Sequence, residues 1–323
     1  MSTTATNTTT AASGRLDTTT LAAAGFAIVV WSSSFAAIAY GLRAFSPAEL
    51  SLLRFLIASA VLLVPLAAGL VKLPPARDWP AILALGFSGI TLYQLALGYA
   101  MTRMSVGATA VIIALAPGVT AALAALRLGE RITARTLTGL AIAFGGVVVI
   151  TLGSGKDVRF EPMALCALVA VFAASVYFVF QKPLLARTSS LGFTVASIFA
   201  GTIGLVPFGL DLPAKIASVP AAQLWSAAYL GIVPTIVGYL CWNFALSRAP
   251  AAKVSSFMYV QPLIASLIAW LCLGQVPTVV TAIGGLLAVG GVVLTVGATR
   301  RIAAPVAAPI LAHPLPRNCC MQS

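Results

Sequence analysis

Residues 137–150 read LTGLAIAFGGVVVI, and residues 282–295 read AIGGLLAVGGVVLT, 145 positions further along the chain. This likeness extends without a gap over residues 85–150 and 230–295, where 18 of 66 positions are identical. Glycine and proline constrain the backbone, so their recurrence is the more telling part. The matched positions are Pro117 with Pro262, Gly129 with Gly274, Gly139 with Gly284, and Gly145-Gly146 with Gly290-Gly291. We infer one structural unit that is used twice.

The composition places this repeated unit in a membrane. Hydrophobic residues make up 60% of the chain, charged residues make up 8%, and the mean hydropathy is +1.03. An ordinary soluble domain has about 25% charged residues, so a soluble fold is excluded. The net charge is +12, yet no run of Lys and Arg is long enough for a basic patch, and nucleic acid is not expected as a partner.

Ten apolar segments are long enough, or nearly so, to cross a bilayer as helices, which predicts an all-α membrane protein with ten transmembrane helices. Because proline ends or bends a helix, Pro207 and Pro234 leave eight or nine spans as an alternative. The segments are Leu21 to Tyr40, Glu49 to Leu70, Trp79 to Ala100, Val106 to Leu126, Leu137 to Leu152, Met163 to Phe180, Phe193 to Phe208, Leu224 to Leu246, Ser255 to Leu273 and Val279 to Val296.

The repeat predicts the domain organisation. Residues 21–152 form the first five-helix repeat and residues 163–297 the second, between a polar N-terminal tail (1–20), expected to be disordered, and a cytoplasmic C-terminal tail (298–323). Five is an odd number, so the second copy enters the membrane from the opposite side and the repeats are inverted. Inverted repeats are typical of secondary transporters, with a site near the midplane between the halves. A purely structural duplication is the alternative.

The basic residues predict the orientation. With the N-terminus in the cytoplasm, 13 of the 19 Lys and Arg residues fall in cytoplasmic loops and tails, as the positive-inside rule requires. We therefore expect a multi-pass protein of the inner membrane with both termini cytoplasmic and the lipid bilayer as its solvent. Small residues four apart, Gly139 with Ala143 and Gly284 with Ala288, predict close helix packing within the chain. A homodimer interface is the alternative use of that face.

Short motifs in a fixed order carry a family resemblance. They are Trp31-Ser32-Ser33-Ser34-Phe35, Arg54-Phe55, and Pro117 followed by Leu128-Gly129-Glu130, with an echo in Pro262 and Leu273-Gly274-Gln275. On these residues the chain resembles the drug/metabolite transporter superfamily, specifically its EamA-type members with ten helices. The family pattern has an acidic residue where Gln275 stands, and a tryptophan that is missing from residues 174–177. The resemblance implies export or uptake of small metabolites, amino acids and drugs among them.

Polar and aromatic side chains inside apolar helices are the candidates for a substrate-binding site, because an unpaired polar group is costly in lipid. Three of them, on the eighth segment, share one helical face. The alternative is that the aromatic residues form an interfacial belt and the polar ones join helices. The candidates are Trp31, Tyr93, Gln94, Tyr177, Tyr239, Trp242, Asn243, Tyr259 and Gln261.

A second group is expected to act in gating or structure. Pro117 and Pro262 bend corresponding helices of the two halves, and Glu130 follows the first Leu-Gly. Arg54 lies about 8 Å into the second segment at 1.5 Å per residue. It either snorkels to the outer surface or meets an anionic substrate, and the resemblance favours a structural or gating role.

Other classes of function fit less well. Residues 153–157 lack the spacing of a P-loop, and no nucleophile with a base, metal cluster or cofactor motif appears. All seven acidic residues fall at segment ends or in loops, so we expect facilitated diffusion, exchange, or proton coupling through an end-of-helix carboxylate such as Glu49 or Glu130. A membrane receptor or assembly subunit on a transporter fold remains the alternative.

Overall fold

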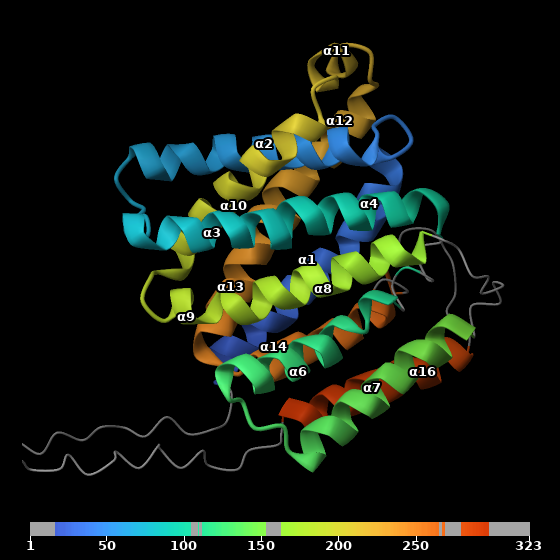
Figure 1. The fold of residues 1–323 in the computed structure, drawn as a ribbon. Helices are drawn as coiled ribbons and strands as arrows, with labels where there is room; N and C mark the ends of the chain where they lie inside the picture. The colour runs from blue at the N-terminus through green and yellow to red at the C-terminus, as the bar shows by residue number, and fades with distance from the viewer. Residues whose placement is uncertain are drawn as a thin grey trace, which may run out of the picture.

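The computed structural model describes residues 17–104, 109, 112–152, 163–264, 267–268 and 279–296, and all regular structure in these residues is helical (Figure 1). The elements in chain order are α1 (Thr18–Gly41), α2 (Pro47–Ala67), η1 (Ala76–Asp78), α3 (Trp79–Gly86), η2 (Phe87–Leu92), α4 (Tyr93–Arg103), α6 (Ala116–Leu128), α7 (Ala134–Leu152), α8 (Ala164–Phe180), α9 (Lys182–Leu185), α10 (Ser190–Leu205), η3 (Val206–Phe208), α11 (Leu212–Ile216), α12 (Ala221–Leu230), η4 (Gly231–Val237), α13 (Gly238–Arg248), α14 (Ala251–Ser256), η5 (Phe257–Val260) and α16 (Val279–Val296).

Six helical runs in the described residues are long and apolar enough to cross a membrane. They correspond to the first, second, third, sixth, seventh and eighth predicted segments. Their bounds are Thr18–Gly41, Pro47–Ala67, Ala76–Arg103, Ala164–Leu185, Ser190–Phe208 and Ala221–Arg248. Shorter apolar helices cover Ala116–Leu128, Ala134–Val149 and Ala282–Val296. Parts of the fourth and ninth predicted segments, residues 1–16 and the C-terminal tail lie outside the described residues. Residues 17–20, which were predicted from the sequence to belong to the N-terminal tail, instead cap and begin α1.

Local sequence signals set several helix ends. Ser46 and Glu49 form a reciprocal capping box at the start of α2, with Pro47 in its first turn. Asp17 caps α1 by accepting a hydrogen bond from the backbone N–H of Thr20. At the C-terminal end of α6, Gly129 has a φ of 65°. Glycine tolerates this left-handed conformation, which stops the helix.

The two halves repeat each other in three dimensions. The helical runs Ala76–Arg103 and Ala221–Arg248 are offset by 145 residues at both their first and their last residues. The first residues of α7 and α16 are offset by the same 145 residues. Each long run contains a π-helical stretch at the same place, η2 in the first half and η4 in the second. Pro234 lies inside η4 and does not end the run, so the eighth predicted segment is continuous. Pro207 lies in the 3₁₀ turn that ends the seventh.

Helices α7 and α16 pack against each other along their length, beside α6 and α14 (Figure 1). Gly139 lies against Gly291, whereas Gly146 lies against Gly284, so the two helices run antiparallel. Gly139 is the repeat equivalent of Gly284, and Gly146 is the repeat equivalent of Gly291, so the repeat converts one pair into the other. Contacts that exchange in this way are the signature of a two-fold axis. The small-residue face predicted from the sequence is therefore used for packing within the chain.

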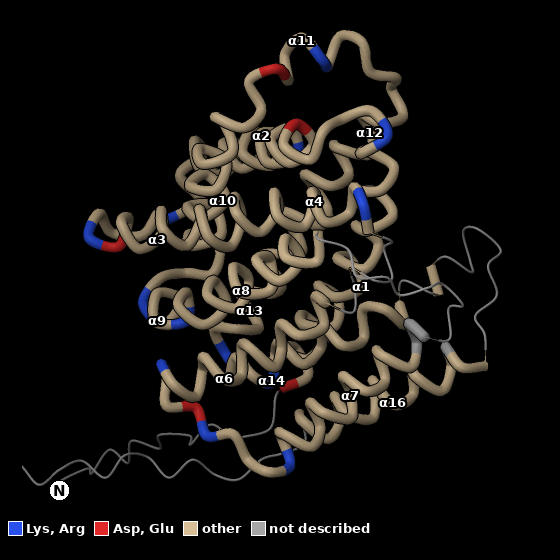
Figure 2. Tube along the Cα trace, turned by 45° about the vertical axis from the view of Figure 1, so that its right-hand side comes forward, with Lys and Arg blue, Asp and Glu red and all other residues tan. Residues whose placement is uncertain are grey.

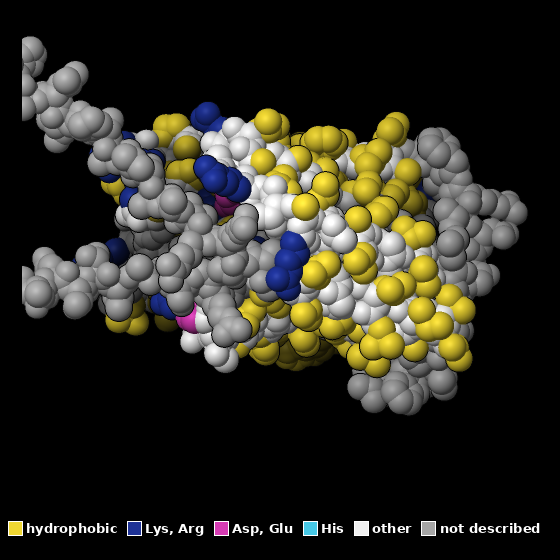
Figure 3. All heavy atoms as spheres, turned by 90° about the horizontal axis from the view of Figure 1, so that it is seen from below, with side chains coloured by type: hydrophobic (Ala, Val, Ile, Leu, Met, Phe, Trp, Pro, Cys, Tyr) yellow, Lys and Arg dark blue, Asp and Glu magenta, His cyan; other side chains and the backbone are white. Residues whose placement is uncertain are grey.

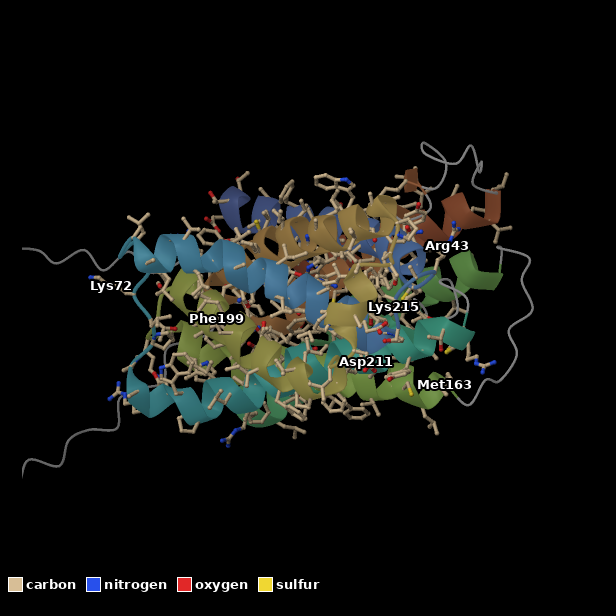
Figure 4. The ribbon with its side chains drawn as sticks, turned by 90° about the horizontal axis from the view of Figure 1, so that it is seen from above. Arg43, Lys72, Met163, Phe199, Asp211 and Lys215 are labelled. Atoms are coloured by element: carbon tan, nitrogen blue, oxygen red, sulfur yellow. The ribbon has the colours of Figure 1, made fainter. Side chains whose placement is uncertain are left out.

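The distribution of charge and apolar surface fits a bilayer. Lys, Arg, Asp and Glu gather at helix ends and in loops (Figure 2). Apolar side chains spread over the described part of the flank in Figure 3, where charged groups are few. Leu126 is 86% exposed and Trp225 74% exposed, which a lipid surface solvates and water does not. Arg43 and Lys72 mark opposite ends of the bundle (Figure 4).

Candidate functional site

A cavity opens in the middle of the bundle, between helices of both halves. Its empty space is about 550 Å³, including its mouth. The first half lines it from α1, α2, η2 and α4, and the second half from α8, α13, η5 and the residue that follows η5. The lining residues are Trp31, Ser34, Phe35, Ile38, Arg54, Gly89, Tyr93, Gln94, Leu97, Ala174, Phe178, Tyr239, Met258 and Gln261.

Aromatic rings form one wall of this cavity. The ring centroid of Trp31 lies 4.9 Å from that of Trp242 and 5.7 Å from that of Tyr239. Phe178 completes the wall, 5.0 Å from Trp242. Trp242 itself is fully buried behind the lining. Ring pairs at these separations attract each other and hold the wall rigid.

The first helix of each half sends an aromatic residue onto the π-helical stretch of the other half. The indole N–H of Trp31 donates to the carbonyl of Pro234 over 3.0 Å. Tyr177 packs its ring directly on Gly89, where a Cβ would clash with it. Gly89 and Pro234 are 145 residues apart and are equivalent in the repeat. An aromatic residue of each half, Trp31 in the first and Tyr177 in the second, thus contacts the equivalent position of the other half.

Arg54 projects from α2 into the cavity and is only 4% exposed, so it does not reach the outer surface. Its Nε donates to the hydroxyl of Thr235 over 2.6 Å, and its Nη1 donates to Oε1 of Gln94 over 3.3 Å. Proline has no N–H, so Pro234 cannot donate to the carbonyl of Leu230. The Thr235 hydroxyl donates to that carbonyl over 2.8 Å, which turns its oxygen lone pairs toward Arg54.

A second, smaller cavity adjoins the first. Its empty space, including the open space at its mouth, is about 290 Å³, and it lies toward the turn between α1 and α2. Four residues line both cavities: Ile38, Arg54, Gln94 and Leu97. The Arg54–Gln94 hydrogen bond thus lies at the junction of the two spaces.

The structure brings six of the predicted residues together at the cavity and places the others elsewhere. Trp31, Arg54, Tyr93, Gln94, Tyr239 and Gln261 line it. Tyr177 and Trp242 are buried beside it, in contact with lining rings. Asn243 donates to the hydroxyl of Thr194 over 2.8 Å. Tyr259 packs in a separate apolar cluster with residues of α7 and α16, away from the lining.

The remaining predicted positions have local roles in the described residues. Pro117 stands in the first turn of α6, and Pro262 directly follows Gln261. Glu130 accepts hydrogen bonds from Nζ of Lys182 over 2.7 Å and from the backbone N–H of Ala251 over 2.9 Å. It therefore ties the end of α6, in the first half, to α9 and α14 in the second.

Sequence reasoning missed the apolar part of the lining. Phe178 and Met258 carry no polar atom, and nothing in the sequence separates them from side chains that face lipid. Phe35 belongs to a motif that carries the family resemblance, which does not by itself place its side chain at the cavity. Among the described residues no group of three or more His, Cys, Asp and Glu is placed to hold a metal ion.

Comparison with known proteins places this architecture. A probable terminal-alkyne amino-acid exporter of Streptantibioticus cattleyicolor is 35% identical over 285 residues, 86% of this chain and 95% of that protein. A probable amino-acid metabolite efflux pump of Salmonella typhimurium is 25% identical over 83% of this chain and 92% of that protein. One crystal structure shares the fold with a TM-score of 0.69, at 22% identity, over 86% of this chain and 96% of the other.

The family-level match covers both halves of the chain. The EamA-like transporter family matches residues 19–152 and again residues 162–297. Both matches together span the helices that line the cavity. The chain therefore belongs to the EamA-like transporter family of membrane transporters.

Proposed function

We propose that the protein is a secondary transporter that exports a small metabolite, an amino acid or a drug-like solute, across the inner membrane by alternating access. The central cavity is the observation that carries this proposal. It is lined by both halves, and a site between two halves can be opened to either side by rocking one half against the other. Substrate contacts the lining side chains Trp31, Tyr93, Gln94, Tyr239 and Gln261.

The proposed architecture has ten transmembrane helices in two inverted halves, residues 21–152 and 163–297. Two reciprocal contacts support the inversion. The glycine pairs of α7 and α16 exchange partners under the repeat. The contacts of Trp31 on Pro234 and of Tyr177 on Gly89 are similar, because Gly89 and Pro234 are equivalent and the two aromatic residues lie 146 apart on the first helices of the two halves. Halves related by a two-fold axis in the membrane plane can exchange conformations, which turns an inward-open state into an outward-open one.

The proposed orientation has both termini in the cytoplasm. The positive-inside bias of the sequence supports it. Arg43, assigned to the outside, and Lys72, assigned to the inside, lie at opposite ends of the bundle (Figure 4). The names of the similar proteins from Streptantibioticus and Salmonella support export of an amino-acid-like substrate.

The test is efflux from proteoliposomes that are preloaded with a pool of radiolabelled amino acids. Phe178 lines the cavity and is 5% exposed, whereas Phe172, on the same helix, faces outward and is 58% exposed. If the protein is a transporter, the wild type should show saturable efflux. Phe178→Ala should lower the ratio of the maximal efflux rate to the half-saturation concentration about tenfold or more. Phe172→Ala is the matched control and should retain the wild-type rate.

The receptor reading makes the opposite prediction. A receptor or assembly subunit on this fold would give no saturable flux of any solute in the pool, for wild type and both variants alike.

Collapse of the proton gradient tests the coupling in the same vesicles. Efflux that is unaltered by the collapse supports facilitated diffusion or exchange, in keeping with the absence of any carboxylate from the described lining, and efflux that falls when an imposed gradient is collapsed supports proton coupling.

A further inference from the structure

Arg54 is a buried cation without a counter-ion in the described part of the chain. The ion pairs found there join Lys182 to Glu130, Arg187 to Asp78, and Arg248 to Asp17. None of these involves Arg54, and no carboxylate lines either cavity. A charged side chain inside the membrane is costly and is normally paired. The Arg54 guanidinium lies 5.4 Å from the ring centroid of Phe55, a cation–π contact that offsets part of this cost but supplies no counter-ion.

The donors of Arg54 are only partly used. A guanidinium has five N–H groups, and the hydrogen bonds to Thr235 and Gln94 use Nε and Nη1. No hydrogen bond from Nη2 is found among the described residues. Nη2 is also not one of the fully buried side-chain atoms that lack a hydrogen-bond partner, so it retains some accessible surface. Its N–H groups therefore face the open space of the cavity.

We propose that Arg54 is the carboxylate-binding group of the transport site, and that the substrates are small carboxylates with an apolar body. This assignment rests on the proposed function. Arg presents a planar fork that matches the two oxygens of a carboxylate. Thr235 and Gln94 hold the guanidinium in place through Nε and Nη1, which leaves both N–H groups of Nη2 and one of Nη1 for the carboxylate oxygens. Arg54 is thus a substrate-binding group rather than a purely structural one.

The rest of the lining matches the other end of such a substrate. Phe35, Ile38 and Phe178 offer apolar surface, which favours an aliphatic or aromatic body. Uncharged polar side chains, among them Tyr93, Tyr239 and Gln261, also line the cavity. An amino group next to the carboxylate finds hydroxyl and amide acceptors there. A substrate with an amine and no carboxylate meets the Arg54 charge unopposed and is repelled.

Arg54 also lies where a solute would pass from one cavity to the other. Arg54 and Gln94 line both the central cavity and the smaller one toward the α1–α2 turn. A solute that moves between the two spaces passes the guanidinium at close range. The cation therefore discriminates against positively charged solutes during movement as well as in the bound state.

The experiment measures binding by tryptophan fluorescence on the full-length protein in detergent, because Trp31 lines the cavity and Trp242 lies behind it. The probes are three matched pairs, each an amino acid and its decarboxylated amine: leucine and 3-methylbutylamine, phenylalanine and 2-phenylethylamine, methionine and 3-methylthiopropylamine. We expect at least one amino acid to bind saturably and its amine to bind about tenfold or more weakly, the loss expected when a hydrogen bond to a charged group is removed.

Variants then connect that preference to Arg54. Arg54→Gln should weaken amino-acid binding about tenfold or more and abolish the difference within each pair. Arg54→Lys keeps the charge without the fork, so it should restore part of the preference. Thermal unfolding of each variant shows whether it is folded, and the matched pairs on the wild type decide the question if Arg54→Gln is not.

Each outcome has a defined meaning. Amines that bind as tightly as their amino acids, a preference that survives in Arg54→Gln, or no binding by any amino acid in the panel would overturn the carboxylate assignment. Binding with the expected preference, together with no flux in proteoliposomes, would leave the assignment standing and refute the transport function on which it was built.

Discussion

Gly139 and Gly291 touch backbone to backbone: a Cβ built on Gly139 would lie 2.7 Å from the carbonyl oxygen of Gly291, and one built on Gly291 would lie 2.5 Å from that of Gly139. Gly146 has the same relationship to Gly284, at 2.5 Å. Real Cβ atoms do not approach a carbonyl oxygen so closely. The α7–α16 pair is therefore held together by glycine positions at which any side chain forces the helices apart.

Two neighbouring glycines give a sharp test of this packing. Gly146→Ala should destabilise the protein by about 1–3 kcal/mol, the usual cost of overpacking. Gly145 has nothing within 4 Å of its Cβ direction, so Gly145→Ala should be neutral or stabilising by up to about 1 kcal/mol through helix propensity. Unfolding of the detergent-solubilised protein measures both.

The same pair recurs in the second half and serves as the control. Gly291→Ala should destabilise as Gly146→Ala does, and Gly290→Ala, whose Cβ direction is also open, should not. Equal effects of the two substitutions within either half would contradict the packing described for α7 and α16.

Much of this arrangement was predictable from the sequence, because it follows from periodic or repeated residues. The 145-residue repeat predicted the equivalence of α7 and α16, and the spacing of small residues predicted that they face a close neighbour. Five of the nine polar and aromatic candidates within apolar runs line the cavity. These signals are strong because a lone polar group in lipid is costly wherever it lies.

What the sequence did not reveal depends on tertiary contacts or on wholly apolar positions. Thr235 lies 181 residues from Arg54, and nothing local marks it as that residue's partner. Phe178 and Phe172 are the same residue type on one helix, yet one lines the cavity and the other faces outward. Tyr259 stands near Pro262 in the sequence, but its side chain packs toward α7 and α16.

Trp31 allows a test of the contact between the halves. Trp31→Phe removes the indole N–H that donates to the carbonyl of Pro234 and keeps a ring beside Tyr239 and Trp242. We expect a loss of about 1 kcal/mol in the free energy of unfolding, the net contribution of one hydrogen bond. Thermal unfolding measures that loss, and efflux kinetics on the same variant should show a raised half-saturation concentration.

A surface tryptophan is the matched control. Trp225 on α12 is 74% exposed, so Trp225→Phe should change the free energy of unfolding by less than about 0.5 kcal/mol. A Trp31→Phe variant as stable as Trp225→Phe would mean that the hydrogen bond to Pro234 contributes nothing to holding the halves together.

Glu130 joins the halves at one end of the bundle through two kinds of contact, and substitutions separate them. Glu130→Gln keeps an oxygen that can accept from the N–H of Ala251 but loses the charge that pairs with Lys182. Glu130→Ala loses both. Stability should therefore fall in the order wild type, Glu130→Gln, Glu130→Ala, with the second step worth about 1 kcal/mol, as for loss of a helix cap.

The charge contribution is isolated by a double-mutant cycle between Glu130→Gln and Lys182→Met. The side chain of Glu130 is 14% exposed and that of Lys182 24% exposed, so the pair is screened less than an ordinary surface pair. We expect a coupling of about 1 kcal/mol at low salt, falling in 1 M salt as the Debye length drops to about 3 Å. The Glu130→Gln variant carries no charge at this position, so its free energy of unfolding should change less with salt than that of the wild type. Additive effects at low salt would mean that Glu130 acts only as the cap of α14, and that the contact between the two halves at this end depends on backbone hydrogen bonds rather than on charge.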